Sequence, residues 1–203
     1  MTAPSTDRGR SSRARIVDSA GDLFYRRGVA ATGLNEVAAA SGTGKGQLYH
    51  YFRDKPDLVL AVVQAQVERT LQPQRSRLDG VTSVEDLRAW ADQAVAAHQS
   101  GRPARCPLGA LVSELADGDE ALRQALDDGF ARWRTLLAAG ISRLQDRGFL
   151  RRDREPYDLA EVLLCAYEGG VLISEARGDT RPLRLALDAT LDAMLTPAQN
   201  ATS

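Results

Sequence analysis

Apolar residues recur at helical spacing along almost the whole chain, and this periodicity limits the fold more than any other feature. Within residues 12–27, for example, Ile16, Ala20 and Phe24 fall on one face of a helix. No convincing run of alternating apolar and polar residues appears, so strands are not expected. Glycines and prolines interrupt the pattern where helices must end. The sequence therefore predicts an all-α protein.

Interrupting residues divide the chain into about nine helices. Gly28 ends the first helix, Ser41 and Gly42 separate the second from the third, and Gly148 ends the seventh. The predicted helices span residues 12–27, 33–40, 44–51, 54–77, 83–98, 107–116, 119–146, 156–177 and 182–195. Two short helices after a longer one, with a Gly-containing turn between them, are typical of a helix-turn-helix.

Hydroxyl and carboxylate side chains stand where three of these helices begin. Thr32, Thr43 and Asp54 precede the second, third and fourth helices. Such side chains accept hydrogen bonds from the free backbone N–H groups of a first turn. Asp57 follows Asp54 by three residues, the spacing of a capping box. We therefore expect all three residues to act as N-caps.

The predicted domains are a head and a body of opposite charge. A helix-turn-helix head is expected over residues 11–58 and a helical-bundle body over 59–197, with tails at 1–10 and 198–203. Residues 1–55 hold nine Lys/Arg and five Asp/Glu, a net charge of +4, whereas the remainder holds seventeen and twenty-two, a net of −5. This asymmetry suits a head that meets a polyanion, although a split this small also arises by chance.

Several function classes lack support in the sequence. The chain has no apolar run near the ~18 residues of a membrane helix and no apolar signal-peptide region, so a cytoplasmic protein is expected. Its two cysteines and two histidines form no metal-ligand cluster, and no cofactor is expected. No nucleophile turn or paired carboxylates with a partner base indicate an enzyme.

The segment 43–55, TGKGQLYHYFRDK, gives the third helix an unusual exposed face. On a helical wheel Leu48 and Phe52 fall together and should face the core. Gly46, Gln47 and His50 point away from that face. Tyr, His, Lys and Gln side chains suit phosphate oxygens and base edges, and a glycine permits close approach. We interpret this segment as a recognition helix; an ordinary solvated helix is the alternative.

The stretch 31–59, ATGLNEVAAASGTGKGQLYHYFRDKPDLV, resembles the TetR family of bacterial transcription regulators. The resemblance implies a homodimer whose third helices enter the DNA major groove of a pseudo-palindromic operator. It also implies a helical body that binds a small apolar or amphipathic effector and then releases DNA, as in a repressor. The alternative is a DNA-binding regulator or architectural protein without a small-molecule inducer.

The family pattern assigns DNA contacts to nine positions. Those facing the groove are Lys45, Gly46, Gln47 and Tyr49. Those contacting phosphates or lying beside the DNA backbone are His50, Tyr51, Lys55 and Thr32. The ninth, Thr43, departs from the pattern because the family's hydroxyl usually stands one place later. Here Gly44 holds that later place, so the Thr43 hydroxyl is expected to cap the helix instead.

The body offers less specific signals, and a weaker resemblance over 105–115 and 130–141 points to a branch that includes regulators of drug efflux. Glu168 lies in the run 159–173, which is apolar nearly all round. An acid there must be paired, protonated or facing a cavity. An ordinary core role also accounts for the large aromatic residues and the cysteines. The candidate pocket residues are Trp90, His98, Leu111, Phe130, Trp133, Cys165 and Glu168.

The last two predicted helices are candidates for dimerisation. The helix over 156–177 is apolar on too many sides for one core to cover. Its Gly169-Gly170 pair costs helix stability, roughly 1 kcal/mol each against Ala, and close helix crossing would compensate. The candidate interface residues are Gly169, Gly170, Ile173, Leu187 and Leu191.

Overall fold

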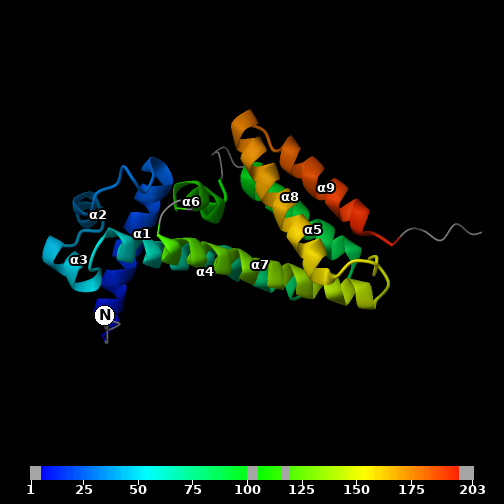
Figure 1. Cartoon of the computed structure of the whole chain (residues 1–203), viewed down its shortest axis with the longest axis horizontal. Coiled ribbons are helices and arrows are strands. Elements are labelled where there is room, and N and C mark those ends of the chain that lie inside the picture. Colours follow the sequence, from blue (N-terminus) through cyan, green and yellow to red (C-terminus); the bar gives the residue numbers. More distant parts are fainter. Residues whose placement is uncertain (1–5, 100–104, 116–118, 197–203) are drawn as a thin grey trace, which may run out of the picture. The chain divides into compact units, whose positions relative to one another are not determined.

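The structure, a computed structural model, describes residues 6–99, 105–115 and 119–196. These ranges contain nine α-helices and no β-strand, which confirms the predicted all-α class (Figure 1). Their one extended contact is an isolated bridge between Leu150 and Leu195. The helices are α1 Asp7–Arg27, α2 Leu34–Ala40, α3 Lys45–Tyr51, α4 Lys55–Leu78, α5 Val84–Gln99, α6 Pro107–Leu115, α7 Glu120–Asp146, α8 Pro156–Arg177 and α9 Arg181–Met194.

The chain forms two compact units that are interleaved in sequence. Residues 1–70 and 107–129 make the first unit, and residues 71–106 and 130–203 make the second. The head predicted over residues 11–58 falls within the first unit, and its last helix runs on past it, as α4 crosses into the second unit. α7 also runs from one unit into the other, and α6 packs on α1 in the first unit. The predicted domain limits at residues 58 and 59 stay predictions.

The helix-turn-helix lies in the first unit and is held by α1. Gly28 ends α1 with φ of 85°, a conformation that favours glycine, and its N–H donates to Phe24 O at 2.8 Å. Leu48 and Phe52 are each 1% exposed, as the wheel predicted. Since α1, α2 and α3 contact one another around these residues, α3 turns its opposite face outward.

The two threonine caps are absent, and this part of the sequence prediction was wrong. The N-cap of α2 is Gly33, while the Thr32 hydroxyl donates to Gly28 O at 2.8 Å. The N-cap of α3 is Gly44, while Thr43 Oγ1 bonds Ser41 Oγ at 2.8 Å. Both threonines are buried, so their hydroxyls serve buried polar groups of the connecting turns instead of a helix end.

The start of α4 follows the prediction more closely. Asp54 accepts a hydrogen bond from the Asp57 N–H at 2.9 Å. Asp57 in turn accepts from the Arg53 N–H at 3.0 Å. The carboxylates therefore satisfy two backbone donors at the end of α3 and the beginning of α4, and fix the angle at which the longer helix leaves the head.

In the second unit, α8 and α9 lie side by side (Figure 1). Gly170 of α8 lies against Leu183 of α9: a Cβ atom added to the glycine would be 2.8 Å from the Leu183 Cα atom. The buried face of α9 consists of Leu183, Leu187, Leu191 and Met194. The apolar face of α9 is therefore buried within a single protomer, with α8 as its main packing partner.

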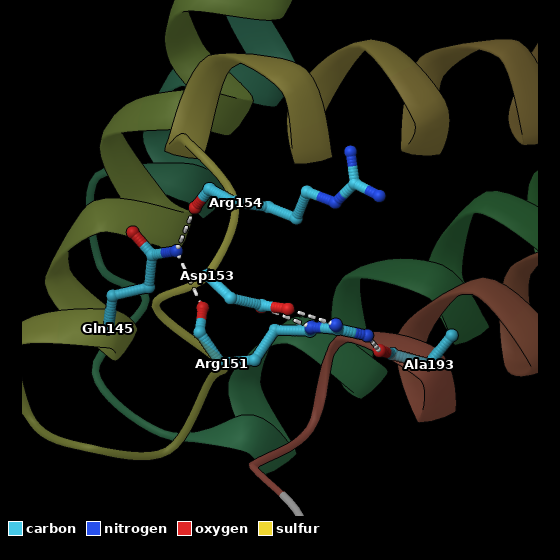
Figure 2. A network of polar contacts seen from close by, with 5 residues as sticks. All are labelled: Gln145, Arg151, Asp153, Arg154 and Ala193. Carbon is cyan, nitrogen blue, oxygen red and sulfur yellow. Dashed lines mark hydrogen bonds and ion pairs between the residues drawn. The ribbon is translucent and has the colours of Figure 1, made fainter.

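The connection between α7 and α8 is held by a polar network around Gln145 (Figure 2). The buried Gln145 side-chain amide donates to Arg151 O at 2.8 Å and to Arg154 O at 2.9 Å. The Arg151 guanidinium pairs with Asp153 and reaches Ala193 O at 3.4 Å. This network joins the α7–α8 connection to the end of α9.

Candidate nucleic-acid interface and ligand site

The outer face of α3 carries hydrogen-bonding side chains and no large aliphatic residue. Tyr49 is 52% exposed. The exposed residues of the helix are Lys45, Gly46, Gln47, Tyr49 and His50. Lys45 forms no hydrogen bond or ion pair with any described residue. A Cβ atom added to Gly46 would meet nothing within 4 Å. This face is therefore open to an external partner at the positions predicted to read the groove.

The predicted phosphate contacts are partly engaged with the protein itself. The rings of His50 and Tyr51 pack edge to face, with centroids 5.1 Å apart, and Tyr51 is half-buried. The Lys55 ammonium donates to Ala30 O at 3.3 Å, which ties the start of α4 to the α1–α2 turn. Thr32 and Thr43 are 1% and 8% exposed, and their hydroxyls bond Gly28 O and Ser41 Oγ within the protein. Their predicted DNA contacts stay predictions.

A groove of about 450 Å³ lies in the first unit between α1 and α4. Its lining includes the buried Val17 and Ala61 and several charged residues. Some of these charges bond within the head: Arg69 pairs with Asp18, and the Arg13 guanidinium lies 5.1 Å from the Phe52 ring centroid. Sequence reasoning missed this groove, because two helices far apart in the chain form it.

An aromatic cluster in the second unit brings together three of the predicted pocket residues. Tyr167 of α8 lies at its centre, 7% exposed. Its ring centroid is 5.1 Å from Trp133, 5.8 Å from His98 and 6.3 Å from Trp90. Burial raises the pKa of the Tyr167 hydroxyl. Sequence reasoning missed this tyrosine, although its place beside Glu168 in an apolar helix was an available signal.

The two tryptophans of this cluster differ in their polar contacts. Trp90 Nε1 donates to Gln74 Oε1 at 2.7 Å. Trp133 is 0% exposed, and its Nε1 has no hydrogen-bond partner among the described residues. An indole N–H can only donate, so the Trp133 nitrogen is a buried donor that awaits an acceptor.

Glu168 of α8 is half-buried. Burial raises the pKa of its carboxyl, and a hydrogen bond from the Cys106 side chain partly offsets this rise. Its Oε1 atom is buried without a partner in the described chain. The sequence left open whether this acid is paired, protonated or facing a cavity, and a pocket role for Glu168 stays a prediction.

The other predicted pocket residues lie outside this cluster. Cys165 is exposed, which contradicts both a pocket and a core position, because it lies on the outer side of α8. Phe130 of α7 is half-buried. Leu111 is buried in α6, which belongs to the first compact unit.

Comparison with known proteins identifies both parts of the chain. Residues 16–62 match the family "Bacterial regulatory proteins, tetR family". Residues 83–189 match "Transcriptional regulator LmrA/YxaF-like, C-terminal domain". This chain belongs to the TetR family. It is a transcriptional regulator, as the sequence of the helix-turn-helix head predicted.

Three TetR-family relatives illustrate the match. The regulator YxaF of Bacillus subtilis is 31% identical over 185 residues, covering 89% of this chain and 93% of YxaF. The repressor NemR of Escherichia coli is 26% identical over 92% of this chain and 96% of NemR, and the structure of its reduced form superimposes with a TM-score of 0.82 over 92% and 99% of the two chains. A SmeT–triclosan complex superimposes with a TM-score of 0.75 at 25% identity, covering 93% of each chain.

The proposed dimer residues of this TetR-family chain separate into two groups. Leu187, Leu191 and Gly170 are buried within the protomer's own α8–α9 contact, which removes them from any surface. Gly169 and Ile173 are exposed, the latter by 50%. Other exposed apolar residues accompany them on α8 and α9: Val162, Leu172 and Leu185.

The described part of the chain holds no cluster of three or more His, Cys, Asp or Glu residues placed to bind a metal ion. Among the same residues, no helix is both long and apolar enough to cross a membrane.

Proposed function

We propose that this TetR-family regulator is a repressor that binds a pseudo-palindromic operator as a homodimer. A small amphipathic molecule held in the second unit releases it. The observation that carries the DNA-binding part is the exposed face of α3, where Lys45, Gln47 and Tyr49 project from a helix anchored by Leu48 and Phe52.

The chemistry of this face suits a major groove. The Gln47 amide can bond adenine in two places, and the Lys45 ammonium is a donor for guanine or phosphate oxygens. The open position at Gly46 lets the helix backbone approach the DNA closely. His50 and Tyr51, whose rings pack edge to face at the end of α3, are the proposed contacts to the sugar-phosphate backbone.

A second copy of the chain is the proposed partner for the exposed apolar side of α8 and α9. Val162 and Leu172 are 56% and 65% exposed, and Leu185 of α9 is 56% exposed. Several large apolar side chains exposed on two neighbouring helices favour an interaction site there. Two-fold symmetry at this surface would present two α3 helices to a two-fold DNA site.

The unsatisfied groups of the aromatic cluster support an effector rather than a DNA-binding protein without one. Trp133 Nε1 and Glu168 Oε1 are both buried without partners in the described chain. Buried polar groups are normally paired, and a bound molecule is one means of pairing them. A structural neighbour, SmeT, forms a complex with triclosan.

Selection of binding sites from random duplex DNA tests the proposal directly. The enriched sequences should be pseudo-palindromes, and a dimer should shift them in a gel. The slope of log affinity against log salt should be steep, because phosphate contacts release counterions. Equal binding to all duplexes, or selection of a single asymmetric half-site by a monomer, would contradict the proposed function.

A further inference from the structure

Three acids of α8 lie on one face of the helix, and only the middle one has no arginine. Glu161, Glu168 and Glu175 are seven residues apart, which is nearly two full turns each. Glu161 pairs with Arg134 of α7, and Glu175 pairs with Arg105 at 2.7 Å. Glu168 has no ion-pair partner in the described chain. The row therefore lacks a cation at its centre.

An aromatic cluster begins at the residue next to this central acid. Tyr167 precedes Glu168 on α8, and burial, with a smaller contribution from the Glu168 carboxyl, raises the pKa of the Tyr167 hydroxyl. The rings of Trp133, His98 and Trp90 lie within 6.3 Å of the Tyr167 ring, centroid to centroid. Aromatic faces attract cations, most strongly where water is excluded, so an acid next to such a cluster suits an organic cation.

The second unsatisfied group adds a requirement for an oxygen. Trp133 Nε1 is a donor with no acceptor, in a side chain that is 0% exposed. Trp90 needs no acceptor from a ligand, because its indole N–H already donates to Gln74. A molecule that paired only with Glu168 would leave the Trp133 donor unsatisfied, which is unfavourable in a buried site.

We propose that the effector is an organic cation whose protonated amine pairs with Glu168 and whose oxygen accepts a hydrogen bond from Trp133 Nε1. The inference rests on the proposed function, since it names the ligand class of the same site. It narrows the class from small amphipathic molecules in general to amines that carry an ether, carbonyl or hydroxyl oxygen on an apolar body.

A matched pair of probes tests the charge. Propranolol joins a naphthyl ether to a protonated secondary amine, and 3-(1-naphthyloxy)-1,2-propanediol replaces that amine with a neutral hydroxyl. Calorimetric titration of the full chain should show propranolol binding about tenfold or more tightly than the diol. In Glu168→Gln this preference should fall to about twofold or less. The control Glu161→Gln alters a half-exposed acid that already has an arginine, and should keep the preference.

The indole donor is tested with an isosteric replacement. Substituting β-(3-benzothienyl)alanine for Trp133 removes the N–H but keeps the ring volume. Both probes should bind more weakly, because both contain the ether oxygen, while the thermal stability of the free protein should hold or rise. The same replacement at Trp90 breaks the bond to Gln74 and should lower stability.

The outcomes separate this inference from the proposed function. Equal affinity for the two probes, a preference that persists in Glu168→Gln, or no saturable binding of propranolol up to about 1 mM overturns the inference. Titration of the selected operator into the same preparations tests the proposed function on its own. If the chain binds operator but has equal affinity for the two probes, the proposed DNA-binding function stands and the inference of an organic-cation effector is wrong.

Discussion

Glu114 of α6 accepts a hydrogen bond from the backbone N–H of Val29 at 2.5 Å, across 85 residues of sequence. Val29 follows Gly28, whose positive φ ends α1, and a Cβ atom on Gly28 would lie 2.9 Å from the same carboxylate oxygen. The turn that leads into the helix-turn-helix is therefore attached to α6 by one side chain, within the first compact unit.

Removing this side chain should loosen the turn. Glu114→Ala leaves the Val29 N–H to water and should lower the free energy of unfolding by about 0.5–1.5 kcal/mol. Glu114→Gln keeps an acceptor oxygen of the same reach and should lose clearly less. Denaturant unfolding of both variants measures the difference, and equal losses would show that the charge, not the hydrogen bond, stabilises the turn.

The open position on the recognition helix gives a prediction in which stability and DNA binding change in opposite directions. Gly46→Ala adds a methyl group that meets nothing within 4 Å in the free protein. Alanine within a helix is more stable than glycine by about 0.5–1 kcal/mol, so the melting temperature should rise. Operator affinity should fall if the backbone approaches DNA closely. If both the melting temperature and the operator affinity rose, the DNA would not lie against the helix backbone at Gly46.

Two lysines of the head should differ in their effect on DNA binding. Lys45 forms no hydrogen bond or ion pair with the described residues, whereas Lys55 bonds Ala30 O. Lys45→Ala should cost about 1–3 kcal/mol of operator affinity without loss of stability. Lys55→Ala should weaken binding to all sequences alike and also lower the melting temperature slightly. Gel-shift titrations with selected and scrambled duplexes, together with thermal unfolding, distinguish the two patterns.

The proposed dimer surface predicts a different response from exposed and buried leucines. Leu172 is 65% exposed, so Leu172→Asp should leave the protomer folded but weaken the dimer and, with it, operator binding. Leu187 is 0% exposed, so Leu187→Ala should cost about 2–5 kcal/mol of protomer stability. Sedimentation at micromolar concentration checks both, and an unmutated protein that sediments as a monomer would rule out the interface.

The buried acid should make stability fall with rising pH. Burial raises the Glu168 pKa above its ordinary value of 4.5, so the folded state holds this proton more tightly than the unfolded state does. The free energy of unfolding therefore decreases as pH rises from about 4.5 through the folded pKa, and Glu168→Gln should remove that decrease. Denaturant unfolding between pH 4 and 8 measures the difference between the two proteins.

Asp86, at the start of α5, is a control because its pKa is shifted in the opposite direction. Hydrogen bonds from Thr82 and Ser83, the Thr82 backbone N–H foremost, hold its pKa below the ordinary value of 3.8. Its stabilising effect is therefore present above that value and is lost as pH falls through the lowered pKa. Asp86→Asn should reduce stability at neutral pH and should narrow the gap to wild type in acid.

The helices themselves could be predicted from the sequence because their signals are local. Apolar spacing, Gly28 and the prolines that begin α6 and α8 predicted the element order, and the positions of Leu48 and Phe52 predicted which face of α3 is exposed. A wheel at 100° per residue is enough for such inferences. The same locality explains why Asp54 was identified as a cap.

What could not be predicted depends on contacts between distant segments. The Thr32 and Thr43 hydroxyls turn inward to groups that a propensity rule does not see. Leu187 and Leu191 fit any apolar partner, and only the packing of α9 on α8 assigns them to the protomer's own core. Tyr167 is the centre of the aromatic cluster only because Trp133, His98 and Trp90 contact it from other helices.

The close contact between Gly170 of α8 and Leu183 of α9 limits how these two helices can move. With no side chain at Gly170, the Leu183 backbone sits so close that even a single methyl group would collide with it. Sliding one helix along the other would drive Leu183 into the neighbouring side chains of α8. We therefore expect α8 and α9 to resist sliding past each other and to move together, so that the proposed effector beside Tyr167 and Glu168 would displace both helices as one body.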